Sequence, residues 1–334
     1  MSLLVVIPCL NEARHLEGLM KGMLADKDIT ALVVADGGST DGSQAIVERL
    51  SQSDCRVHLL DNPARIQSAG VNLAVARYGQ GMEWLLRVDA HCLYPPHYSR
   101  TLLKAAKERE ASAVVVPMFT KGIKGFQLAV AAAQNSVLGT GGSPHRSSGE
   151  GMFVEHGHHA LMKIDLFKQV GGYCEGMPCN EDAELDHRLI EAGGRIWLEP
   201  AAAIIYLPRE TMGALAKQYF KYGKGRAATI KRHRVLPRLR QMIPLAVPAA
   251  MALLPLSFVH PIFALPFFSW LALCLVVGAV VGLRPNKIRS RGGWRVLAGV
   301  AAAIMHASWG LGFLKGWLFP NGANEPRYGL IPET

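Results

Sequence analysis

The sequence predicts an α/β domain with a mostly parallel sheet, followed by a C-terminal segment of apolar helices. Two observations predict the domain. Short, near-continuous apolar runs alternate with amphipathic stretches over residues 1–117, and the first of these runs end in polar turns that open helices. Strands covered on both faces have this composition, and strand–helix alternation favours a parallel sheet. A third observation predicts the segment: residues 241–283 contain no Asp, Glu, Lys or Arg.

The expected elements follow from these patterns. Strands are predicted at Leu3–Ile7, Ala31–Ala35, Val57–Leu60, Trp84–Val88 and Ala113–Val116, and helices at Glu12–Leu24, Asp41–Leu50, Arg65–Ala76 and Pro96–Arg109. Asp41 is a candidate cap for the second helix, and Pro96 suits the first turn of the fourth. After Pro117 the pattern weakens. There we expect strands at His156–Met162, Ile196–Leu198 and Ala203–Tyr206, helices at Ile164–Val170 and Glu181–Ala192, and a loop at Thr140–Gly151.

Three apolar runs follow a long basic amphipathic helix at Thr211–His233. They are Ile243–Val259, Ile262–Leu283 and Val296–Leu318, and each is a candidate transmembrane helix by length. The first run is short and Pro-rich, so it is also compatible with a re-entrant or interfacial segment. Buried core helices of a soluble domain are the alternative for all three.

The basic residues are concentrated around these runs. The formal net charge is +10, with nine Lys or Arg between Lys217 and Arg240, five between Arg284 and Arg295, and no acid in either stretch. Such flanks mark the cytoplasmic side of membrane segments, whereas a nucleic-acid binder spreads its basic residues over a folded surface. The first two runs are therefore expected to form a hairpin that turns at His260-Pro261 on the far side. The third run, if it spans, would place the tail there too.

The remaining bulk features favour a cytoplasmic location for the N-terminal domain. The six Cys form no CxxC pair, which indicates reduced thiols. The first residues lead directly into a predicted strand and lack the basic region of a signal peptide.

The first two predicted strands each end in a polar turn, Pro8-Cys9-Leu10-Asn11-Glu12 and Asp36-Gly37-Gly38-Ser39-Thr40-Asp41. Ligands of open α/β sheets bind beyond such strand ends. Asp36 is placed to accept hydrogen bonds from a base or ribose, and the glycines would let a ligand approach the backbone. A simple turn and helix cap is the alternative. The chain has neither GxGxxG after its first strand nor a GxxxxGK[ST] loop, which argues against a dinucleotide enzyme and a P-loop NTPase.

The fourth predicted strand leads into Asp89-Ala90-His91. Alternate residues of an extended chain point the same way, so Asp89 and His91 are expected to share one metal ion. A carboxylate with an imidazole suits Mn²⁺ better than Mg²⁺, though either fits. A helix cap at Asp89 and an ordinary surface histidine are the alternative.

Four acids crowd the start of a predicted helix, in Glu181-Asp182-Ala183-Glu184-Leu185-Asp186. They would complement the positive end of the helix dipole. Beside a sugar donor, one of them would instead serve as a general base toward a hydroxyl group.

Together the three motifs resemble the family 2 inverting glycosyltransferases of GT-A fold, over about residues 1–210. The resemblance implies a UDP-sugar donor and a divalent metal, Mn²⁺ or Mg²⁺. It implies a nucleotide-binding half (1–117) and an acceptor-binding half (118–210). The basic and apolar runs that follow predict an interface helix (211–240), a membrane segment of two to three helices (241–320) and a tail (321–334). The implied roles are uracil contact for Asp36, ribose or metal contact for Asp89, metal binding for His91, catalysis for Asp182 as base with Glu181 beside it, and donor-pocket positions for Pro8, Asn11, Glu12 and Arg65. The chain departs from the family at His91, where a second Asp is usual.

Two further motifs bear on the acceptor. Gln218, Lys221 and Tyr222 occupy the positions of the Gln-x-x-Arg-Trp motif of processive synthases, but Lys cannot reproduce the bidentate fork of Arg. We therefore expect no processive synthesis. An acceptor contact remains expected, and packing of the helix on the domain is the alternative. His156, His158 and His159 are candidates for structural or acceptor-site roles, His156 above all.

Arg87–His91, Val154–Ala160 and Gln218–Arg226 also resemble glucosyltransferases of succinoglycan biosynthesis, which extend a lipid-linked oligosaccharide. This resemblance implies UDP-glucose as donor, a polyprenyl-diphosphate-linked saccharide as acceptor, and an enzyme of exopolysaccharide assembly at the inner (plasma) membrane. Nucleic acid is not an expected partner. The alternatives are a processive polysaccharide synthase and a nucleotide-binding membrane protein without catalysis.

Overall fold

The computed structural model describes residues 2–140, 149–177, 179–234, 242–283, 293–319 and 328–330. The chain forms two compact units. The sheet unit comprises Met1–Met118, Ser147–Ile205 and Glu325–Thr334, and the helical unit comprises Phe119–Arg146 and Tyr206–Asn324. Residues 119–146, which the sequence analysis assigned to the N-terminal domain, thus belong with the later helices.

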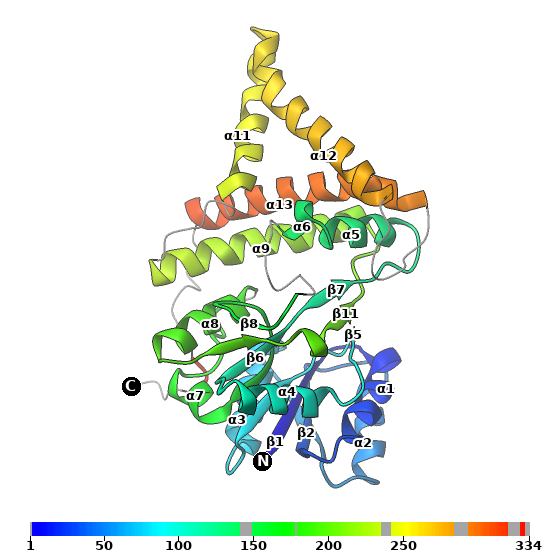
Figure 1. The fold of residues 1–334 in the computed structure, drawn as a ribbon, viewed down its shortest axis with the longest axis vertical. Helices are drawn as coiled ribbons and strands as arrows, with labels where there is room; N and C mark the ends of the chain where they lie inside the picture. Colours follow the sequence, from blue (N-terminus) through cyan, green and yellow to red (C-terminus); the bar gives the residue numbers. More distant parts are fainter. Residues whose placement is uncertain are drawn as a thin grey trace. The chain divides into compact units, whose positions relative to one another are not determined.

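The sheet unit is built on an eight-stranded sheet (Figure 1). Its order is β3-β2-β1-β4-β9-β6-β10-β8. The strands are β1 (Leu3–Cys9), β2 (Ile29–Asp36), β3 (Val57–Asp61), β4 (Trp84–Arg87), β6 (Ala113–Val116), β8 (Met152–Phe153), β9 (His158–Lys163) and β10 (Ile196–Leu198). Neighbours from β3 to β4 are parallel, as are β6 and β10, whereas β9 is antiparallel to both its neighbours. The predicted mostly parallel sheet is confirmed.

The helices of the sheet unit are α1 (Ala13–Leu24), α2 (Ser43–Ser51), α3 (Gln67–Tyr78), α4 (Tyr98–Glu108), α7 (Ile164–Gln169) and α8 (Glu181–Glu191). The short strands β5 (Cys92–Leu93) and β11 (Ile204–Tyr206) are neighbours outside the main sheet. Strands β1 and β2 are fully buried at Leu3–Ile7 and Leu32–Ala35, which explains their unbroken apolar sequence.

Two predicted helix starts need correction. Pro96 lies before α4, because that helix begins at Tyr98 and its N-cap residue is His97, which is in a left-handed conformation (φ 55°) and makes no side-chain capping hydrogen bond. Asp41 precedes the N-cap of α2, which is Gly42 (φ 95°). Its carboxylate nevertheless accepts hydrogen bonds from the Ser43 amide (3.0 Å) and from the Ala13 amide (2.9 Å), so it supports the starts of both α1 and α2.

The helical unit contains α5 (Phe126–Gln134), α6 (Val137–Thr140), α9 (Met212–His233), α11 (Ala246–Leu253), α12 (Leu265–Leu283) and α13 (Ala298–Leu318). Single 3₁₀ turns join them: η3 (Ile243–Leu245), η4 (Leu254–Phe258), η5 (Pro261–Ala264) and η6 (Gly293–Leu297). The short strand β7 (Met118–Thr120) precedes α5, and η2 (Pro200–Ala202) precedes β11. Helix α5 was not predicted, since its Ala-rich sequence is buried throughout and shows no polar face.

Two helices of the described chain are long and apolar enough to cross a membrane, Pro261–Leu283 and Gly293–Leu318. The first apolar run forms only a shorter helix, Ile243–Phe258, in which prolines interrupt the regular hydrogen bonding and leave 3₁₀ turns at both ends. The predicted turn at His260-Pro261 is present, and the His260 Nδ1 atom accepts the Ile262 amide there. Most of the predicted Thr140–Gly151 loop lies outside the described residues.

Helices α9 and α13 approach each other through glycines. A Cβ atom at Gly223 would collide with the carbonyl oxygen of Trp309, and one at Gly312 with that of Phe220. We therefore expect Gly223→Ala to lower the free energy of unfolding by about 1–3 kcal/mol, the usual cost of overpacking. Gly213, on the same helix, has no atom within 4 Å of its Cβ position. Gly213→Ala is the matched control, and thermal unfolding in detergent should show a lower midpoint for Gly223→Ala alone.

Candidate active site

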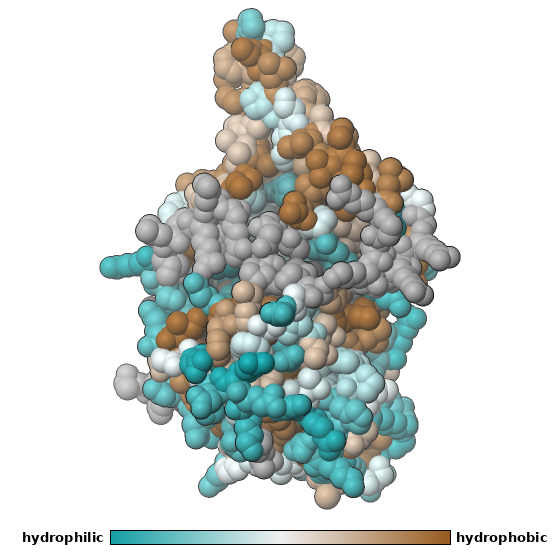
Figure 2. Space-filling view, viewed as in Figure 1, coloured by the Kyte–Doolittle hydropathy of each residue, from teal (hydrophilic) through white to brown (hydrophobic). Residues whose placement is uncertain are grey.

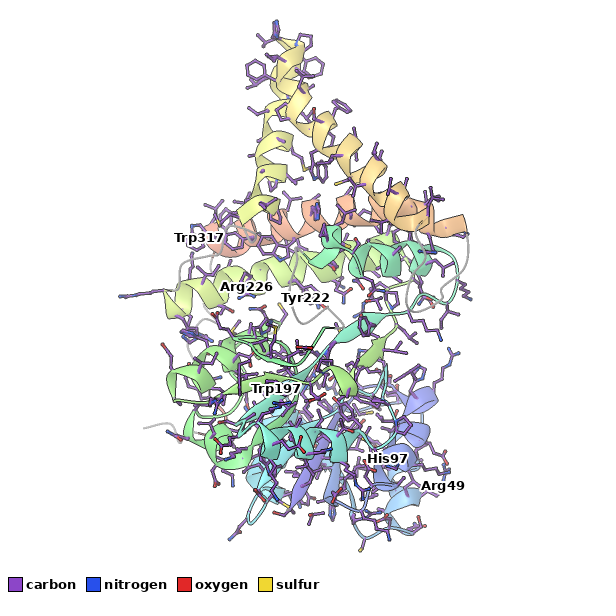
Figure 3. The ribbon with its side chains drawn as sticks, viewed as in Figure 1. Arg49, His97, Trp197, Tyr222, Arg226 and Trp317 are labelled. Atoms are coloured by element: carbon purple, nitrogen blue, oxygen red, sulfur yellow. The ribbon has the colours of Figure 1, made fainter. Side chains whose placement is uncertain are left out.

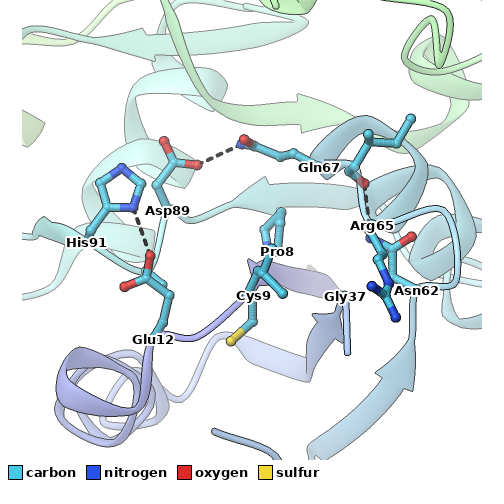
Figure 4. A pocket seen from close by; sticks show the side chains of 12 residues that line it. Pro8, Cys9, Glu12, Gly37, Asn62, Arg65, Gln67, Asp89 and His91 are labelled. Carbon is cyan, nitrogen blue, oxygen red and sulfur yellow. Dashed lines mark hydrogen bonds and ion pairs between the residues drawn. The ribbon is translucent and has the colours of Figure 1, made fainter. Parts of the chain in front are cut away.

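A pocket of about 210 Å³ opens beyond the carboxyl ends of β1 and β4. Loops after β1, β2, β3 and β4 line it, and Figure 4 shows it from close by. The lining residues are Pro8, Cys9, Leu10, Glu12, Gly37, Asn62, Arg65, Ile66, Gln67, Asp89, Ala90 and His91. Five of the predicted donor-site and metal-site residues are among them: Pro8, Glu12, Arg65, Asp89 and His91. Asn11 and Asp36 are not.

Asp36 does not line the pocket and is only 2% exposed. Its carboxylate accepts hydrogen bonds from the Gly38 and Ser39 amides (both 2.9 Å), from the Ser39 hydroxyl (2.5 Å) and from Gln44 Nε2 (2.6 Å). Burial by itself would raise the pKa of Asp36, but these donors outweigh it and lower that pKa. The carboxylate thus holds the turn after β2, as the turn alternative expected. A contact between Asp36 and uracil stays a prediction.

Asn11 connects the two turns. Its side-chain Oδ1 atom accepts a hydrogen bond from the Thr40 backbone amide (2.8 Å). Its backbone N–H group donates to the Ser39 hydroxyl (2.8 Å). The backbone of Gly38 is in the left-handed region (φ 86°), and the guanidinium of Arg65 lies 3.4 Å from its Cβ position. The turn therefore needs glycine there, and Arg65 reaches the pocket by lying against it.

Asp89 and His91 line the pocket, but the backbone that carries them does not have the predicted extended conformation. Strand β4 ends at Arg87, and the Cys92 amide donates to the Asp89 carbonyl (3.2 Å), so residues 89–92 form a turn rather than an extended chain. The prediction that Asp89 and His91 occupy alternate positions of an extended chain is therefore wrong. Both side chains nonetheless line the pocket, where His91 Nδ1 lies 3.3 Å from Glu12 Oε1 (Figure 4).

Three side chains hold the carboxylate of Asp89. Gln67 Nε2 (2.9 Å) and Arg87 Nε (3.3 Å) donate to Oδ1, and His158 Nε2 lies 3.4 Å from Oδ2. Burial alone would raise the pKa of Asp89. The charge of Arg87, then the hydrogen bond and charge of His158 and the charge of His91, outweigh burial and hold this pKa well below its usual range. The carboxylate is therefore anionic at any physiological pH, as a metal ligand must be.

Arg87 joins the pocket to helix α8. Its side chain is only 4% exposed, and its Nη1 atom donates to Asp182 Oδ1 (2.5 Å) and to the Tyr173 hydroxyl (3.0 Å), while its Nε atom donates to Asp89. Burial would lower the pKa of Arg87, but the charges of Asp182 and Asp89 raise it well above its ordinary value. Arg87 was not among the residues predicted for the site. The available signal was a single cation within the apolar run Leu85–Val88, since a buried arginine requires anionic partners.

Helix α8 presents two carboxylates one turn apart. It begins after Asn180, which is in a left-handed conformation (φ 66°). Asp182 accepts hydrogen bonds from Arg87 and from the Tyr173 hydroxyl (3.1 Å), and Asp186 lies on the same face of the helix. The buried Asp186 Oδ2 atom is 2.6 Å from His156 Nδ1. The acids at the start of α8 thus have distinct partners and do more than complement the helix dipole.

His156 and His158 connect helix α8 to the pocket. His156 pairs with Asp186 on α8, and His158, two residues later, pairs with Asp89 at the pocket. These contacts agree with the structural role considered from the sequence, and an acceptor contact of His156 stays a prediction. The side chain of His159 lies outside the described part of the chain.

Glu181 has a strongly perturbed acidity. Burial, followed by repulsion from Asp182, raises the pKa of Glu181 from its ordinary 4.5 to about 7. The folded state then binds the Glu181 proton more tightly than the unfolded state does. The free energy of unfolding should therefore fall as the pH rises from about 4.5 to about 7 and change no further on this account.

We expect Glu181→Gln to flatten that fall, because the amide cannot ionise. Thermal unfolding of the wild-type and variant proteins in detergent at about pH 5 and about pH 8 checks this. If the thermal midpoint of the wild-type protein falls no more than that of the variant between these two pH values, the raised pKa of Glu181 is contradicted.

The remaining acceptor candidates belong to the helical unit. Gln218 is 9% exposed, and its Nε2 atom donates to the hydroxyls of Tyr206 (3.1 Å) and Tyr222 (2.8 Å). Tyr222 is 42% exposed, and its ring packs edge-on against that of Tyr219. Lys221 is exposed on the same helix. Gln218 thus organises the aromatic side chains of its unit, and acceptor binding by Gln218, Lys221 and Tyr222 stays a prediction.

The strand order and the pocket beyond the strand ends describe an α/β domain of GT-A-like fold. The chain belongs to glycosyl transferase family 2, whose model matches residues 4–171. It is 49% identical over 319 residues to the succinoglycan biosynthesis protein ExoA of Rhizobium meliloti (strain 1021), which covers 94% of each chain. The protein is thus a family 2 glycosyltransferase related to ExoA, and the non-catalytic alternative is wrong.

Two solved structures share the fold. The mannosyltransferase PcManGT of Pyrobaculum calidifontis, solved in complex with GDP-Man and Mn²⁺, matches with a TM-score of 0.57 and 18% identity, covering 95% of this chain and 87% of that one. The S. aureus TarS 1-349 structure matches with a TM-score of 0.50 and 12% identity, covering 94% of this chain and 91% of that one.

Proposed function

We propose that this enzyme transfers glucose from UDP-glucose to a polyprenyl-diphosphate-linked saccharide, with inversion, at the cytoplasmic face of the plasma membrane during exopolysaccharide assembly. The observation that carries the proposal is the buried Arg87. It places the pocket carboxylate of Asp89 and the helix carboxylate of Asp182 on one guanidinium. A donor bound at the pocket therefore lies beside a carboxylate able to act on an acceptor.

The residues of the pocket fit a divalent metal. Asp89 is anionic, His91 supplies an imidazole, and Glu12 is within 3.3 Å of His91. This mixed donor set favours Mn²⁺ over Mg²⁺. When bound, such an ion would stabilise the negative charge that develops on the leaving diphosphate. The mannosyltransferase PcManGT, which shares the fold, binds Mn²⁺ and GDP-Man.

The transfer itself is a single displacement at the anomeric carbon. The acceptor oxygen forms its bond to that carbon as the bond to the diphosphate breaks, and the hydroxyl proton passes to the carboxylate of Asp182. Arg87 and the Tyr173 hydroxyl both bond to Oδ1 of Asp182 and so orient the carboxylate. Attack from the face opposite the leaving group gives a β-linked product from an α-linked donor.

Donor turnover tests the proposal. Purified protein in detergent is given Mn²⁺ or Mg²⁺ and a panel of UDP- and GDP-sugars, with a lipid extract as the source of acceptor. We expect metal-dependent release of UDP from UDP-glucose. Asp89→Ala should reduce it at least ~100-fold, because a metal ligand is lost. Asp165→Ala is the matched control, since Asp165 is an exposed carboxylate in the first turn of α7. Release from another donor only would refute UDP-glucose as substrate.

The length of the product distinguishes transfer of a single sugar from processive polysaccharide synthesis. Lys221 and Tyr222 stand where processive synthases carry Arg and Trp, so we propose that one sugar is added per acceptor. Mass spectrometry of the lipid product would show a single hexose increment. A ladder of increments would favour the processive alternative.

A further inference from the structure

The helical unit carries an apolar hairpin, which we define as residues 243–283. One arm is formed by η3, α11 and η4, and the other by η5 and α12, with His260-Pro261 at the tip (Figure 1). The hairpin contains no Asp, Glu, Lys or Arg. Large apolar side chains are nevertheless exposed along it, including Phe258 (96%), Leu273 (62%) and Val276 (64%), and the corresponding surface is hydrophobic in Figure 2. An uncharged projection with this surface is suited to lipid.

The length of the hairpin matches a bilayer. Helix α12 crosses α13 where Gly278 meets Gly299, close enough that neither position has room for a Cβ atom. Residues 261–277, on the tip side of this crossing, give roughly 27 Å of helix at 1.5–2.0 Å per residue. The hydrocarbon core is about 30 Å thick. The hairpin is therefore long enough to reach deep into that core.

Helix α13 is also long and apolar, but it packs along α9. Phe313 lies in one apolar cluster with Ala227 and Ile230 of α9, and the Lys231 ammonium donates to the Trp317 carbonyl and lies 5.0 Å from the Trp317 ring. Figure 3 labels Tyr222 and Arg226 on α9 and Trp317 on α13.

Helix α9 cannot enter hydrocarbon. It contains six Lys and Arg and no acid within Met212–His233. Moving these cations into the bilayer would be prohibitive, whereas the headgroup region of an anionic membrane attracts them. A helix packed along α9 by close backbone contact must stay at the same depth. The packing therefore holds α13 beside a helix that stays out of the hydrocarbon core.

The tail gives an independent argument, because it returns to the sheet unit. Tyr328 pairs with Cys174 in an antiparallel bridge, the Leu330 amide donates to the Gly171 carbonyl (3.4 Å), and Arg188 lies over the Tyr328 ring. Only residues 320–327 separate Phe319 from Tyr328, and they include two Asn, a Glu and an Arg. These eight residues, four of them polar, reach at most about 28 Å when fully extended, and their backbone would have no hydrogen-bond partners in hydrocarbon, so they cannot recross a bilayer. A spanning α13 would instead put Phe319 across the bilayer from the residues that Tyr328 and Leu330 contact.

We propose that the hairpin is the part of this chain that enters the bilayer. It does so from the side of the sheet unit, with α9 and α13 held in the headgroup layer against anionic lipid. The tail then lies on the same side as the sheet unit, and not on the far side as the sequence analysis expected for a spanning third run. The proposal shares with the proposed function only the membrane location, and it does not depend on the donor or acceptor.

Labelling with a membrane-impermeant maleimide tests the position of α13. Leu318→Cys introduces a thiol at the exposed end of α13, and the native Cys55, exposed on the sheet unit, serves as the internal reference. In intact bacterial cells we expect neither thiol to react, and after permeabilisation we expect both to react. Reaction of the Leu318→Cys thiol in intact cells, with Cys55 unreacted, would overturn the proposal.

Paired substitutions test which apolar helix contacts the lipid core. Leu273→Arg with Val276→Arg places two cations on α12, and Leu311→Arg with Leu318→Arg places two on exposed positions of α13. We expect at least a ten-fold drop in the ratio of membrane-bound to soluble protein for the α12 pair. The α13 pair should change this ratio less than two-fold, because cations are accepted in the headgroup layer. Equal losses for both pairs, or loss for the α13 pair alone, would overturn the proposal.

The outcomes also separate this inference from the proposed function. Wild-type protein that washes off membranes in alkaline carbonate would refute both the hairpin insertion and the membrane location. Normal transfer to a lipid acceptor together with an outward-facing Leu318→Cys thiol would refute the inference alone.

Discussion

Asp182→Asn is expected to reduce sugar transfer about 10²–10⁴-fold, the usual contribution of a general base. The amide keeps the size of the side chain and can still accept hydrogen bonds from Arg87 and Tyr173 through its oxygen, so the fold should be retained. It cannot take the acceptor proton. Binding of UDP, measured by calorimetry with Mn²⁺ present, should change less than about three-fold, because the pocket residues are untouched.

Glu181→Gln distinguishes the two neighbouring acids. Asp182 contacts Arg87 and Tyr173, whereas Glu181 has its pKa raised to about 7 by burial and by repulsion from Asp182. We expect a smaller loss of transfer for Glu181→Gln than for Asp182→Asn. If Glu181→Gln were the inactive variant and Asp182→Asn kept its activity, Glu181 would be the base.

Arg87→Met is expected to impair both stability and catalysis. The substitution leaves Asp89 and Asp182 without the cation they share, and removing one partner of a buried ion pair costs about 3–5 kcal/mol. Transfer should be lost in the fraction that stays folded, because the two carboxylates are no longer oriented. Thermal unfolding in detergent and the transfer assay measure the two effects separately.

Two further variants make the Arg87 result specific. Arg87→Lys keeps the charge but cannot bond to Asp89 and to Asp182 through separate nitrogens, so its stability should be closer to wild type than its activity. Adding Asp182→Asn to Arg87→Met should recover part of the lost stability, because it removes one of the unpaired charges. No recovery in the double variant would show that Asp182 and Arg87 do not interact as the structure describes.

The strands and helices that position the site could be predicted from local sequence patterns. The strands β1, β2, β3, β4 and β6 and the helices between them were predicted within two or three residues, because apolar periodicity and polar turns are local properties. The same is true of the motifs after β1 and β2 and of the acids of α8. Where sequence reasoning failed locally, as at Asp89 and His91, it assumed that strand β4 continued beyond Arg87.

Local sequence patterns were thus enough to predict the α/β domain, the positions of its motifs along the chain, and the uncharged run between two basic stretches. No such pattern predicts that Arg87 contacts Asp182, 95 residues away, or that His156 contacts Asp186. The same is true of the pairing of Tyr328 with Cys174 and of the packing of α13 along α9. Periodicity and helix capping involve residues that are near in sequence. The partner of a buried charge, or the backbone that packs against a glycine, instead comes from a segment that is distant in sequence and adjacent only in the folded chain.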